Sequence, residues 1–368
     1  MNFVTIFPET ENFHLTKDVG MIGYILYRYY GYNSKIVCYK NSESYDYLDN
    51  EVKGLKIDFI KKITGSPTKD VLIYLIKNAK KIDILHMFHI TSNRNFYWIL
   101  IYKLLNPKGR VYLKLDADYR IKKFDFNKKG LKGFIKRWLI KKCKLVSIET
   151  KVLYEYVNNN WGINIEYIPN GFYDNGIRNK VSYNEKENII CTVGRIGTNQ
   201  KATEVLLEGF KMAASKIGGW KLKIIGPIEA EFKNYINKFY ENNLDLKEKV
   251  IFTGPIYDKK VLESEYRKSK IFCLTSRYEG FPLVFLEAIK NGCYIISSDF
   301  EASFDITNNK KYGDIFSIDN AFELTQCFSK MCTYENKIKE NCDKVQNYAY
   351  EKFYWPTICK QIDILLRR

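Results

Sequence analysis

Short apolar runs alternate with amphipathic stretches of helical spacing along most of the chain. In the second half the apolar runs predict strands at Asn188–Val193, Lys221–Ile225, Val250–Thr253, Lys270–Leu274 and Cys293–Ser297. Between them apolar residues recur with a helical period, as in Thr203–Ile217 and Lys259–Lys268. Strands that alternate with helices in this way form a parallel sheet covered by helices on both faces.

The first half of the chain repeats this alternation. Its apolar runs predict strands at Phe3–Phe7, Ser34–Tyr39, Ile82–Phe88, Arg110–Leu115, Lys144–Ile148 and Ile165–Ile168. A polar stretch without periodicity, Asn175–Glu187, follows the turn Pro169-Asn170-Gly171 and suits a boundary. We therefore expect an α/β chain with two Rossmann-like domains, residues 1–175 and 176–350. Ligands of such sheets bind beyond the carboxyl ends of the strands.

The composition supports two folded domains and limits the kind of site. Hydrophobic residues make up 46% of the 368 residues, enough to bury a core in each domain. Nine cysteines occur without a C-x-x-C pair and only three histidines are present, so neither disulfides nor a metal site is expected. No apolar run is long enough to cross a membrane and the N-terminal residues lack a secretory pattern, so we expect a cytoplasmic protein.

Charge is distributed unevenly along the chain. The formal charge is +17, of which residues 1–180 carry +14. A basic first half suggests that it faces something anionic. The segment Lys122–Lys144 contains ten Lys or Arg and one Asp, with apolar residues at helical spacing: Leu131, Phe134, Ile135, Trp138 and Leu139.

This segment allows two interpretations. An amphipathic basic helix that bears Trp and Phe can lie on an anionic membrane surface. Alternatively, the apolar stripe packs on the sheet and the lysines are solvated. Both can hold together, because only the basic loop Lys122–Lys129 and the outer helix face need to touch lipid headgroups.

Two carboxylates stand in an unusual place, within Ser276–Asp299 (SRYEGFPLVFLEAIKNGCYIISSD). Glu279 lies in the loop after a predicted strand, and Glu287 lies about two turns into the following apolar helix. A buried, ionised Glu287 needs hydrogen-bond donors. They come either from a nearby Lys or Arg or from ligand hydroxyls such as a ribose diol. Free backbone N–H groups at Gly280–Leu283 would meet a phosphate or a sugar hydroxyl.

A second candidate site lies within Thr192–Phe210 (TVGRIGTNQKATEVLLEGF). The predicted strand ends at Val193, and Arg195 and Lys201 lie in the loop that follows. The spacing matches neither G-x-x-x-x-G-K-S/T nor G-x-G-x-x-G, so no P-loop or dinucleotide fingerprint is expected. Two cations at a strand end suit a diphosphate, although solvated surface residues remain an equal alternative.

In combination, these motifs resemble those of a known family. Glu279-x7-Glu287 within S-R-Y-E-G-F-P-L-V-F-L-E-A, V-G-R-I with the downstream Lys201, and I-P-N-G at Ile168–Gly171 are similar to motifs of the retaining glycosyltransferases of family four. These enzymes have the GT-B fold, in which two parallel sheets face each other across a cleft. The resemblance is looser over the first 160 residues, where it rests on strand order and HLTKDVGMIGY. It implies that a C-terminal helix in residues 351–368 crosses back to the first domain.

The resemblance implies roles for individual residues of the second domain. Arg195 and Lys201 would hold the diphosphate of a sugar nucleotide, Glu287 the ribose hydroxyls, and Ile256 would lie near the base. Glu279 would bind the transferred sugar and act in catalysis. The backbone that follows it would contribute through Gly280, Phe281, Pro282 and Leu283. Such enzymes need no metal or cofactor, because cations and helix N-termini neutralise the leaving diphosphate.

The first domain would bind the acceptor. Asp116 stands where many relatives carry a histidine, and it either orients an acceptor hydroxyl or caps a turn after the strand. Family members bind acceptor groups in the loop after the first strand, which here holds Lys17, Asp18 and Gly20. An ordinary helix start with Thr16 as N-cap explains the same residues. His86 and His89 are expected to be packed or capping residues.

Together these interpretations predict a retaining glycosyltransferase of hexosyl type. It would move a sugar from a nucleoside diphosphate to a hydroxyl of a carbohydrate or lipid-linked oligosaccharide acceptor, in surface polysaccharide synthesis at the inner face of the cell membrane. One alternative is a nucleotide-sugar epimerase of the same architecture, which would release free sugar. Another is a non-catalytic basic module that binds nucleic acid, although no motif for nucleic-acid binding occurs.

Overall fold

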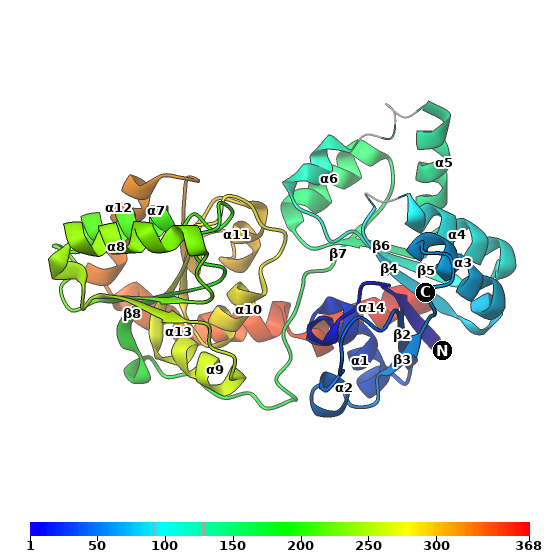
Figure 1. The fold of residues 1–368 in the computed structure, drawn as a ribbon, viewed down its shortest axis with the longest axis horizontal. Coiled ribbons are helices and arrows are strands. Elements are labelled where there is room, and N and C mark those ends of the chain that lie inside the picture. Colours follow the sequence, from blue (N-terminus) through cyan, green and yellow to red (C-terminus); the bar gives the residue numbers. More distant parts are fainter. Residues whose placement is uncertain (91–92, 125, 127–129) are drawn as a thin grey trace. The chain divides into compact units, whose positions relative to one another are not determined.

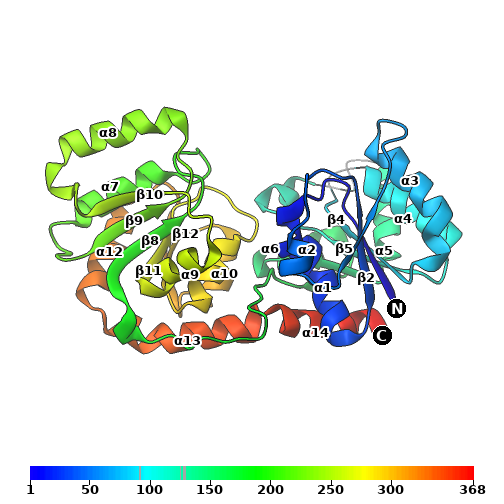
Figure 2. The ribbon, with the colours of Figure 1, turned by 60° about the horizontal axis from the view of Figure 1, so that its bottom comes forward.

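The structure is a computed structural model, and it describes residues 1–90, 93–124, 126 and 130–368. The chain divides into two compact units, the first formed by Met1–Tyr173 with Tyr354–Arg368 and the second by Asp174–Phe353. Figures 1 and 2 show a sheet in each unit with helices on both of its faces. The three buried hydrophobic clusters each draw their residues from a single unit.

The first unit contains a seven-stranded parallel sheet in the order β3-β2-β1-β4-β5-β6-β7. Its strands are β1 (Asn2–Ile6), β2 (Asn33–Cys38), β3 (Lys56–Phe59), β4 (Ile84–Phe88), β5 (Arg110–Lys114), β6 (Leu145–Ile148) and β7 (Glu166–Tyr167). The central strands are buried on both faces, which explains why they read as continuous apolar runs. The strand order reverses beside β1, so this sheet has a topological switch point there.

Helices cover both faces of this sheet. They are α1 (Asp18–Tyr30), α2 (Tyr47–Asn50), α3 (Pro67–Asn78), α4 (Arg94–Leu105), α5 (Gly130–Lys141), α6 (Lys151–Trp161) and α14 (Trp355–Arg367), with 3-10 turns η1 (Asn12–Thr16), η2 (Ala79–Lys81) and η3 (Tyr119–Lys123). Val4 and Ile6 of β1 pack with α3, α4, α5 and α6, whereas Phe3 packs with α1 and α14. Alternate side chains of a strand thus build two separate cores.

The second unit contains a six-stranded parallel sheet in the order β10-β9-β8-β11-β12-β13. Its strands are β8 (Glu187–Val193), β9 (Lys221–Ile225), β10 (Val250–Gly254), β11 (Ser269–Leu274), β12 (Tyr294–Ser298) and β13 (Gly313–Phe316). The order reverses between β8 and β11, which places a switch point between these two strands. The loops that carry the predicted donor residues follow β8 and β11.

The helices of the second unit also lie on both faces of its sheet (Figure 2). They are α7 (Thr203–Ala213), α8 (Lys233–Asn242), α9 (Lys259–Lys268), α10 (Leu283–Lys290), α11 (Glu301–Ile306), α12 (Ala321–Thr333) and α13 (Asn336–Lys352), with 3-10 turns η5 (Tyr183–Glu185), η6 (Ala230–Phe232) and η7 (Leu244–Leu246). On one face, α7 packs closely on α12, since a Cβ at Gly209 would lie 2.7 Å from Leu324 Cδ2. The prediction of two Rossmann-like domains is confirmed.

Candidate active site

The carboxyl ends of β8 and β11 bring two predicted donor residues together. Lys201 Nζ lies 2.6 Å from Glu279 Oε1, and the same oxygen accepts a hydrogen bond of 2.8 Å from Ser276 Oγ. The lysine side chain passes over Gly194, because a Cβ there would lie 3.1 Å from Lys201 Cε. A cation and a carboxylate that are distant in the sequence therefore meet at the switch point of this sheet.

Arg195 lies in the same loop as Lys201 and is linked to the loop of Glu279 through Gln200. Its Nη2 donates to Gln200 Oε1 at 2.9 Å, and Gln200 Nε2 donates to the carbonyl of Tyr278 at 3.0 Å. The backbone N–H of Arg277 in turn donates to the Gln200 carbonyl at 2.8 Å. Gln200 therefore joins the loop of Arg195 to the loop of Glu279. The sequence analysis did not single it out, because a loop glutamine shows no pattern by itself.

The two arginines in these loops differ, because Arg277 forms ion pairs and Arg195 is exposed to solvent. The Arg277 guanidinium pairs with Glu204 at 2.7 Å and with Asp319 at 2.8 Å. The exposed Arg195 guanidinium has a neutral amide as its partner. Its charge is available to an anion, and the fork of its N–H groups suits a phosphate.

The loop between Glu279 and α10 supplies backbone donors. Helix α10 begins at Leu283, and Pro282 occupies the N-cap position. Within the described residues, the backbone N–H groups of Gly280, Phe281 and Leu283 donate to no other protein group. Pro282 has no N–H to offer, while the Phe281 ring is buried against Phe353. The start of α10 thus presents free N–H groups beside Glu279.

Glu287 has a phenol as its partner. The Tyr266 hydroxyl donates to Glu287 Oε2 at 2.8 Å, and no Lys or Arg in the described part of the chain forms an ion pair with this carboxylate. The neighbouring Lys290 Nζ lies 3.5 Å from Glu263 instead. Burial raises the pKa of Glu287, and the hydrogen bond from Tyr266 opposes that rise. The salt-bridge alternative is therefore wrong, and Oε1 of Glu287 retains its capacity to accept hydrogen bonds.

Ile256 lies at the same edge of the second sheet. It follows β10, which is separated from β8 by β9, and its side chain is half-buried next to the exposed Tyr257. The structure therefore places Ile256 two strands away from the strand that leads to Arg195. Its predicted position near a base stays a prediction.

At the carboxyl edge of the first sheet, a buried lysine joins the ends of four elements. Lys114, the last residue of β5, is fully buried and donates to Glu149 Oε1 after β6 and, at 2.9 Å, to Asn170 Oδ1 after β7. Its Nζ also lies 3.1 Å from Asp18 Oδ2 at the start of α1. Burial alone would lower the pKa of Lys114, but the carboxylates of Glu149 and Asp18 raise it. Lys114 is therefore held as a cation.

The same carboxylate holds the turn that carries Asp116. Glu149 accepts the backbone N–H of Asp116 at 3.0 Å and that of Ala117 at 3.2 Å. Asp116 has a positive φ of 42°, a conformation that L residues adopt only where the surroundings hold it. Its Oδ2 lies 3.6 Å from His89 Nδ1, and both side chains are more than one third exposed. Asp116 is thus presented to solvent beside a histidine.

The loop after β1 is explained in part by packing. Helix α1 begins at Asp18 with Lys17 as its N-cap residue, so the prediction of Thr16 as N-cap is wrong. Gly20 is required by packing, because a Cβ there would lie 2.1 Å from the Leu15 carbonyl oxygen. Lys17 Nζ lies over the Phe13 ring at 4.4 Å. Of the three predicted acceptor residues, Asp18 is the one that the Lys114 cluster brings near Asp116.

Lys114, Glu149 and His89 are the residues of this edge that the sequence analysis missed or assigned to packing. A usable signal was present for the first two. Lys114 is a lysine inside the apolar run Val111–Leu115, and Glu149 directly follows the apolar strand LVSI. A charge at the end of a buried parallel strand is the signal that these two residues share, whereas Asp116 was singled out by its place in the family resemblance.

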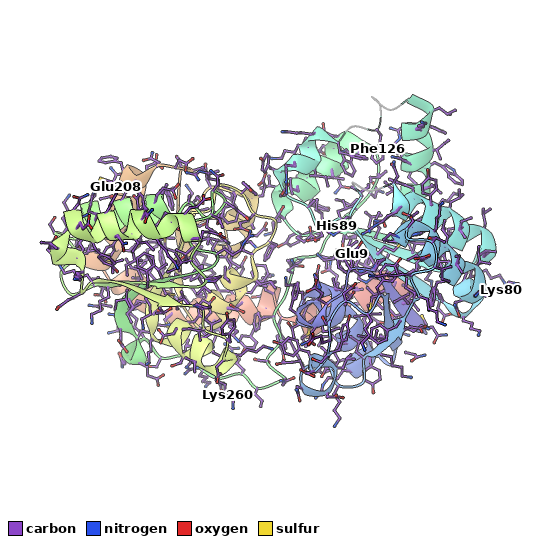
Figure 3. The ribbon with its side chains drawn as sticks, in the orientation of Figure 1. Glu9, Lys80, His89, Phe126, Glu208 and Lys260 are labelled. Atoms are coloured by element: carbon purple, nitrogen blue, oxygen red, sulfur yellow. The ribbon has the colours of Figure 1, made fainter. Side chains whose placement is uncertain are left out.

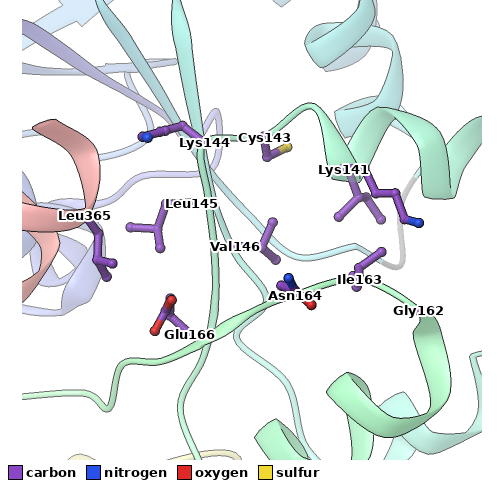
Figure 4. A pocket seen from close by; sticks show the side chains of 11 residues that line it. Lys141, Cys143, Lys144, Leu145, Val146, Gly162, Ile163, Asn164, Glu166 and Leu365 are labelled. Atoms are coloured by element: carbon purple, nitrogen blue, oxygen red, sulfur yellow. The ribbon is translucent and has the colours of Figure 1, made fainter. Parts of the chain in front are cut away.

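Among the described residues of the first unit, cavities lie at opposite edges of the sheet. One of about 650 Å³ lies among the loops after β1, β2 and β3 and is lined by polar groups that include Glu9, Lys40 and Lys62. Figure 3 labels Glu9 and His89, which both follow strands at this edge. The other, of about 470 Å³, lies at the amino ends of β6 and β7 next to Leu365 (Figure 4). The first cavity lies on the edge that carries Asp116, and the second lies on the opposite edge.

Two further observations concern the described residues as a whole. No helix among them is both long and apolar enough to cross a membrane. In the same parts of the chain, no three His, Cys, Asp or Glu side chains are grouped as ligands of a metal ion would be.

Comparison with known proteins shows a similarity of the second unit to one family. Residues 174–352 match the model described as glycosyl transferases group 1. The chain is 27% identical over 201 residues to mannosylfructose-phosphate synthase of Agrobacterium fabrum, which covers 49% of this chain and 43% of that protein. It is 39% identical over 105 residues to the amylovoran biosynthesis glycosyltransferase AmsD of Erwinia amylovora, covering 28% and 27%. The aligned stretches span less than half the length of these relatives.

Similarity to solved structures extends over the whole chain. Anabaena HepE in complex with UDP-glucose superimposes with a TM-score of 0.72, covering 100% of this chain and 99% of that one, at 13% identity. At this identity the likeness concerns the fold alone. The chain therefore has the GT-B fold, and its residues 174–352 are similar to the glycosyl transferases of group 1.

Proposed function

We propose that the chain is a retaining hexosyltransferase that moves a sugar from a nucleoside diphosphate to a hydroxyl of a carbohydrate acceptor. The observation that carries the proposal is the meeting of Lys201 and Glu279 beside Arg195 and the free N–H groups at the start of α10. Cations and N–H donors beside a carboxylate suit a diphosphate joined to a sugar. HepE, which has the same fold, was solved with UDP-glucose.

In the proposed reaction, charge develops on the leaving diphosphate. Lys201, Arg195 and the N–H groups at the start of α10 would stabilise that charge, so no metal ion or cofactor is required. The bond from the anomeric carbon to the diphosphate breaks, and a bond to the acceptor oxygen forms on the same face. The acceptor proton passes to the departing phosphate, so no separate base is needed. Glu279 would orient the transferred sugar and Glu287 the ribose.

The acceptor would bind at the carboxyl edge of the first sheet. Asp116 is exposed there, and the half-buried His89 lies beside it. Carboxylate oxygens of this kind accept hydrogen bonds from sugar hydroxyls. The polar cavity after β1, β2 and β3 would accommodate a more distant sugar of an oligosaccharide. A relative that is 31% identical over 109 residues is named lipopolysaccharide 1,6-galactosyltransferase of Escherichia coli, which supports an acceptor that belongs to a surface polysaccharide.

The proposal is tested first by identifying the donor and then by removing its contacts. Thermal-shift measurements with UDP-, GDP- and dTDP-sugars identify the donor, because a bound ligand stabilises the folded state. With that donor, Lys201→Ala and Glu287→Ala should each reduce kcat by roughly 100- to 1,000-fold. Lys211→Ala, which removes a partly exposed lysine of α7 paired with Glu208, is the matched control and should keep full activity. Near-normal transfer by both site variants would end the assignment.

Product analysis separates the proposed transfer from an epimerase of the same architecture. A transferase yields the nucleoside diphosphate and a glycosylated acceptor in equal amounts. An epimerase yields free sugar at the same rate whether an acceptor is present or not. Acceptor-independent release of the epimeric sugar would therefore replace the proposal.

We also propose that the acceptor is lipid-linked and that the chain works as a peripheral protein at the inner face of the cell membrane. The support is the positive charge of residues 1–180, which suits an anionic surface. A lipid-linked acceptor would present its sugars at that surface.

A further inference from the structure

The outer faces of α4 and α5 expose large apolar side chains to solvent. The two helices are neighbours in the first unit (Figure 1), and Lys136 of α5 lies over the ring of Phe96 of α4 at 4.8 Å. Their exposed apolar residues, between 38% and 75% accessible, form what we call the α4–α5 face: Tyr97, Leu100, Leu104, Leu131, Phe134, Ile135 and Trp138. An exposed apolar surface that two helices share marks an interaction site more often than an isolated apolar residue does.

Helix α5 has apolar residues on two sides. Leu139 and Ile140 are buried in the core that covers the sheet. Leu131, Phe134 and Trp138, spaced by three and four residues, form a separate stripe that leaves the core and is 75%, 59% and 48% exposed. The alternative that this stripe packs on the sheet is therefore wrong. The protein itself leaves these side chains without a core to join.

The charged residues of the two helices themselves are all cationic. Residues 93–115 and 130–148, which include both helices, contain no Asp or Glu. Cationic side chains lie on and beside α5: Lys132, Arg137, Lys141 and Lys142. Lys142 Nζ also lies 5.4 Å from the centre of the Trp138 ring. The loop 122–129, expected from the sequence to touch lipid headgroups, includes residues 125 and 127–129 outside the described part, and the proposal does not depend on it.

These properties favour a lipid surface over other occupants. A second copy of the chain, docked by the same face, would bring lysines against lysines without a carboxylate in residues 93–115 or 130–148 to compensate them. A bilayer with anionic headgroups offers acyl chains to the apolar residues and phosphates to the cations. Trp and Tyr beside Lys are also the side chains typical of membrane interfaces.

We propose that the α4–α5 face docks onto an anionic lipid bilayer, with Phe134 and Trp138 at the boundary between headgroups and acyl chains and Lys132 and Lys141 against lipid phosphates. The role of this docking rests on the proposed function, because a lipid-linked acceptor would be presented at the membrane surface. Binding to lipid needs neither donor nor transfer. The two proposals therefore fail separately.

The test is co-sedimentation of the full chain with vesicles of phosphatidylcholine that contain about one third phosphatidylglycerol. Phe134→Ser with Trp138→Ser should reduce the vesicle-bound fraction at least about tenfold, because two inserted aromatic side chains are lost. The matched control is Phe322→Ser with Tyr334→Ser, which removes two aromatic side chains that are 65% and 71% exposed in the second unit and should bind as the wild type does. Circular dichroism checks that both double variants are folded.

Separate measurements test the contribution of the lysines to vesicle binding and the insertion of Trp138 into the bilayer. Lys132→Gln and Lys141→Gln should each weaken binding by roughly fivefold, and vesicles of phosphatidylcholine alone should bind poorly. Among the five tryptophans, Trp138 is 48% exposed and the other four are at most 3% exposed. Anionic vesicles should therefore shift tryptophan emission to shorter wavelength, and Trp138→Phe should abolish that shift while it preserves sedimentation.

Several results would overturn the inference. Failure of the wild type to bind anionic vesicles at low salt is one, and equal binding by the Phe134 and Trp138 double variant is another. A wild-type dimer that this double variant converts to a monomer would identify the face as a contact between copies. Retention of single-stranded RNA without any vesicle binding would assign the basic surface to nucleic acid. Loss of transfer with vesicle binding intact would count against the proposed function alone.

Discussion

At the scale of single residues, the partner of Glu287 decides how this carboxylate can act. A lysine or arginine partner would have neutralised the carboxylate in an ion pair. The partner is instead the hydroxyl of Tyr266, which donates one hydrogen bond to Oε2 from a ring that is 1% exposed. Tyr266 therefore positions Glu287 without neutralising it. The carboxylate keeps a lone pair and most of its charge for a ligand hydroxyl.

Replacement of Tyr266 by Phe tests this positioning role. The hydrogen bond from Tyr266 opposes the rise in the pKa of Glu287, so its loss should raise that pKa further. A higher pKa keeps the carboxyl protonated up to a higher pH, so affinity for UDP should start to fall at a higher pH as the solution is acidified. At neutral pH we expect about a tenfold loss of affinity. Isothermal titration with UDP over a pH series measures both effects.

The control for Tyr266→Phe is Tyr240→Phe. This variant also loses one partly buried hydrogen bond, from the Tyr240 hydroxyl of α8 to the Val250 carbonyl at 2.8 Å, but at the amino end of β10. The variant should bind UDP as the wild type does. A Tyr266→Phe protein with an unchanged pH profile would show that Glu287 does not depend on this hydroxyl.

At the scale of elements, one ion cluster joins the ends of β5, β6, β7 and α1. Lys114 contacts Glu149, Asn170 and Asp18 and is the centre of this cluster. Glu149 in turn accepts the backbone N–H of Asp116 and so links Lys114 to that turn. The geometry of the proposed acceptor edge therefore depends on a side chain that no ligand can reach, since Lys114 is fully buried.

Lys114→Met should be strongly destabilising. The variant leaves the carboxylates of Glu149 and Asp18 buried without their cation, which costs about 3–5 kcal/mol of unfolding free energy. Because the pKa of Lys114 is raised on folding, its contribution is complete below the ordinary lysine pKa and is lost as the pH rises through the raised value. Urea unfolding over a pH series should therefore show a lower free energy of unfolding for the variant at neutral pH. The difference from the wild type should shrink only at high pH.

The control for Lys114→Met is Lys35→Met. Lys35 pairs with Asp58 in the same sheet, but its side chain is 33% exposed, so solvent can replace the lost partner. Its variant should lose no more than about 1 kcal/mol. A Lys114→Met protein as stable as the Lys35 variant would show that the cluster does not hold the edge together.

At the scale of the whole molecule, the two units have separate cores, and the proposed nucleotide contacts lie in one of them. Differential scanning calorimetry of the full chain should therefore resolve two transitions, as chains with separate cores often do. UDP at about 100 times its dissociation constant should stabilise one unit by about 2.7 kcal/mol and raise one transition temperature. Lys201→Ala should abolish this shift, and an equal shift of both transitions would contradict confinement of the nucleotide site to the second unit.

Much of the architecture was predictable because buried parallel strands leave a simple pattern. Strands β1, β4, β8 and β11 each contain a run of buried, mostly apolar residues and were predicted close to their observed bounds. Of the four edge strands, β7 and β10 were predicted, and β3 and β13 were missed. β3 is half-exposed and reads KIDF, and β13 reads GDIF, so neither forms an uninterrupted apolar run. A strand with only one neighbouring strand can leave more of its side chains in solvent, so its sequence contains polar residues among the apolar ones.

The sequence by itself determined the two Rossmann-like domains and the strand ends that carry charged residues, because the alternation of apolar runs and local spacing are properties of neighbouring positions. Only the tertiary structure decided which partners these charges have. It paired Glu287 with Tyr266, Lys201 with Glu279 and Lys114 with Glu149. It also left the stripe of α5 outside the core. Such pairings join residues that lie far apart in the chain, and local pattern carries no information about the distance between them.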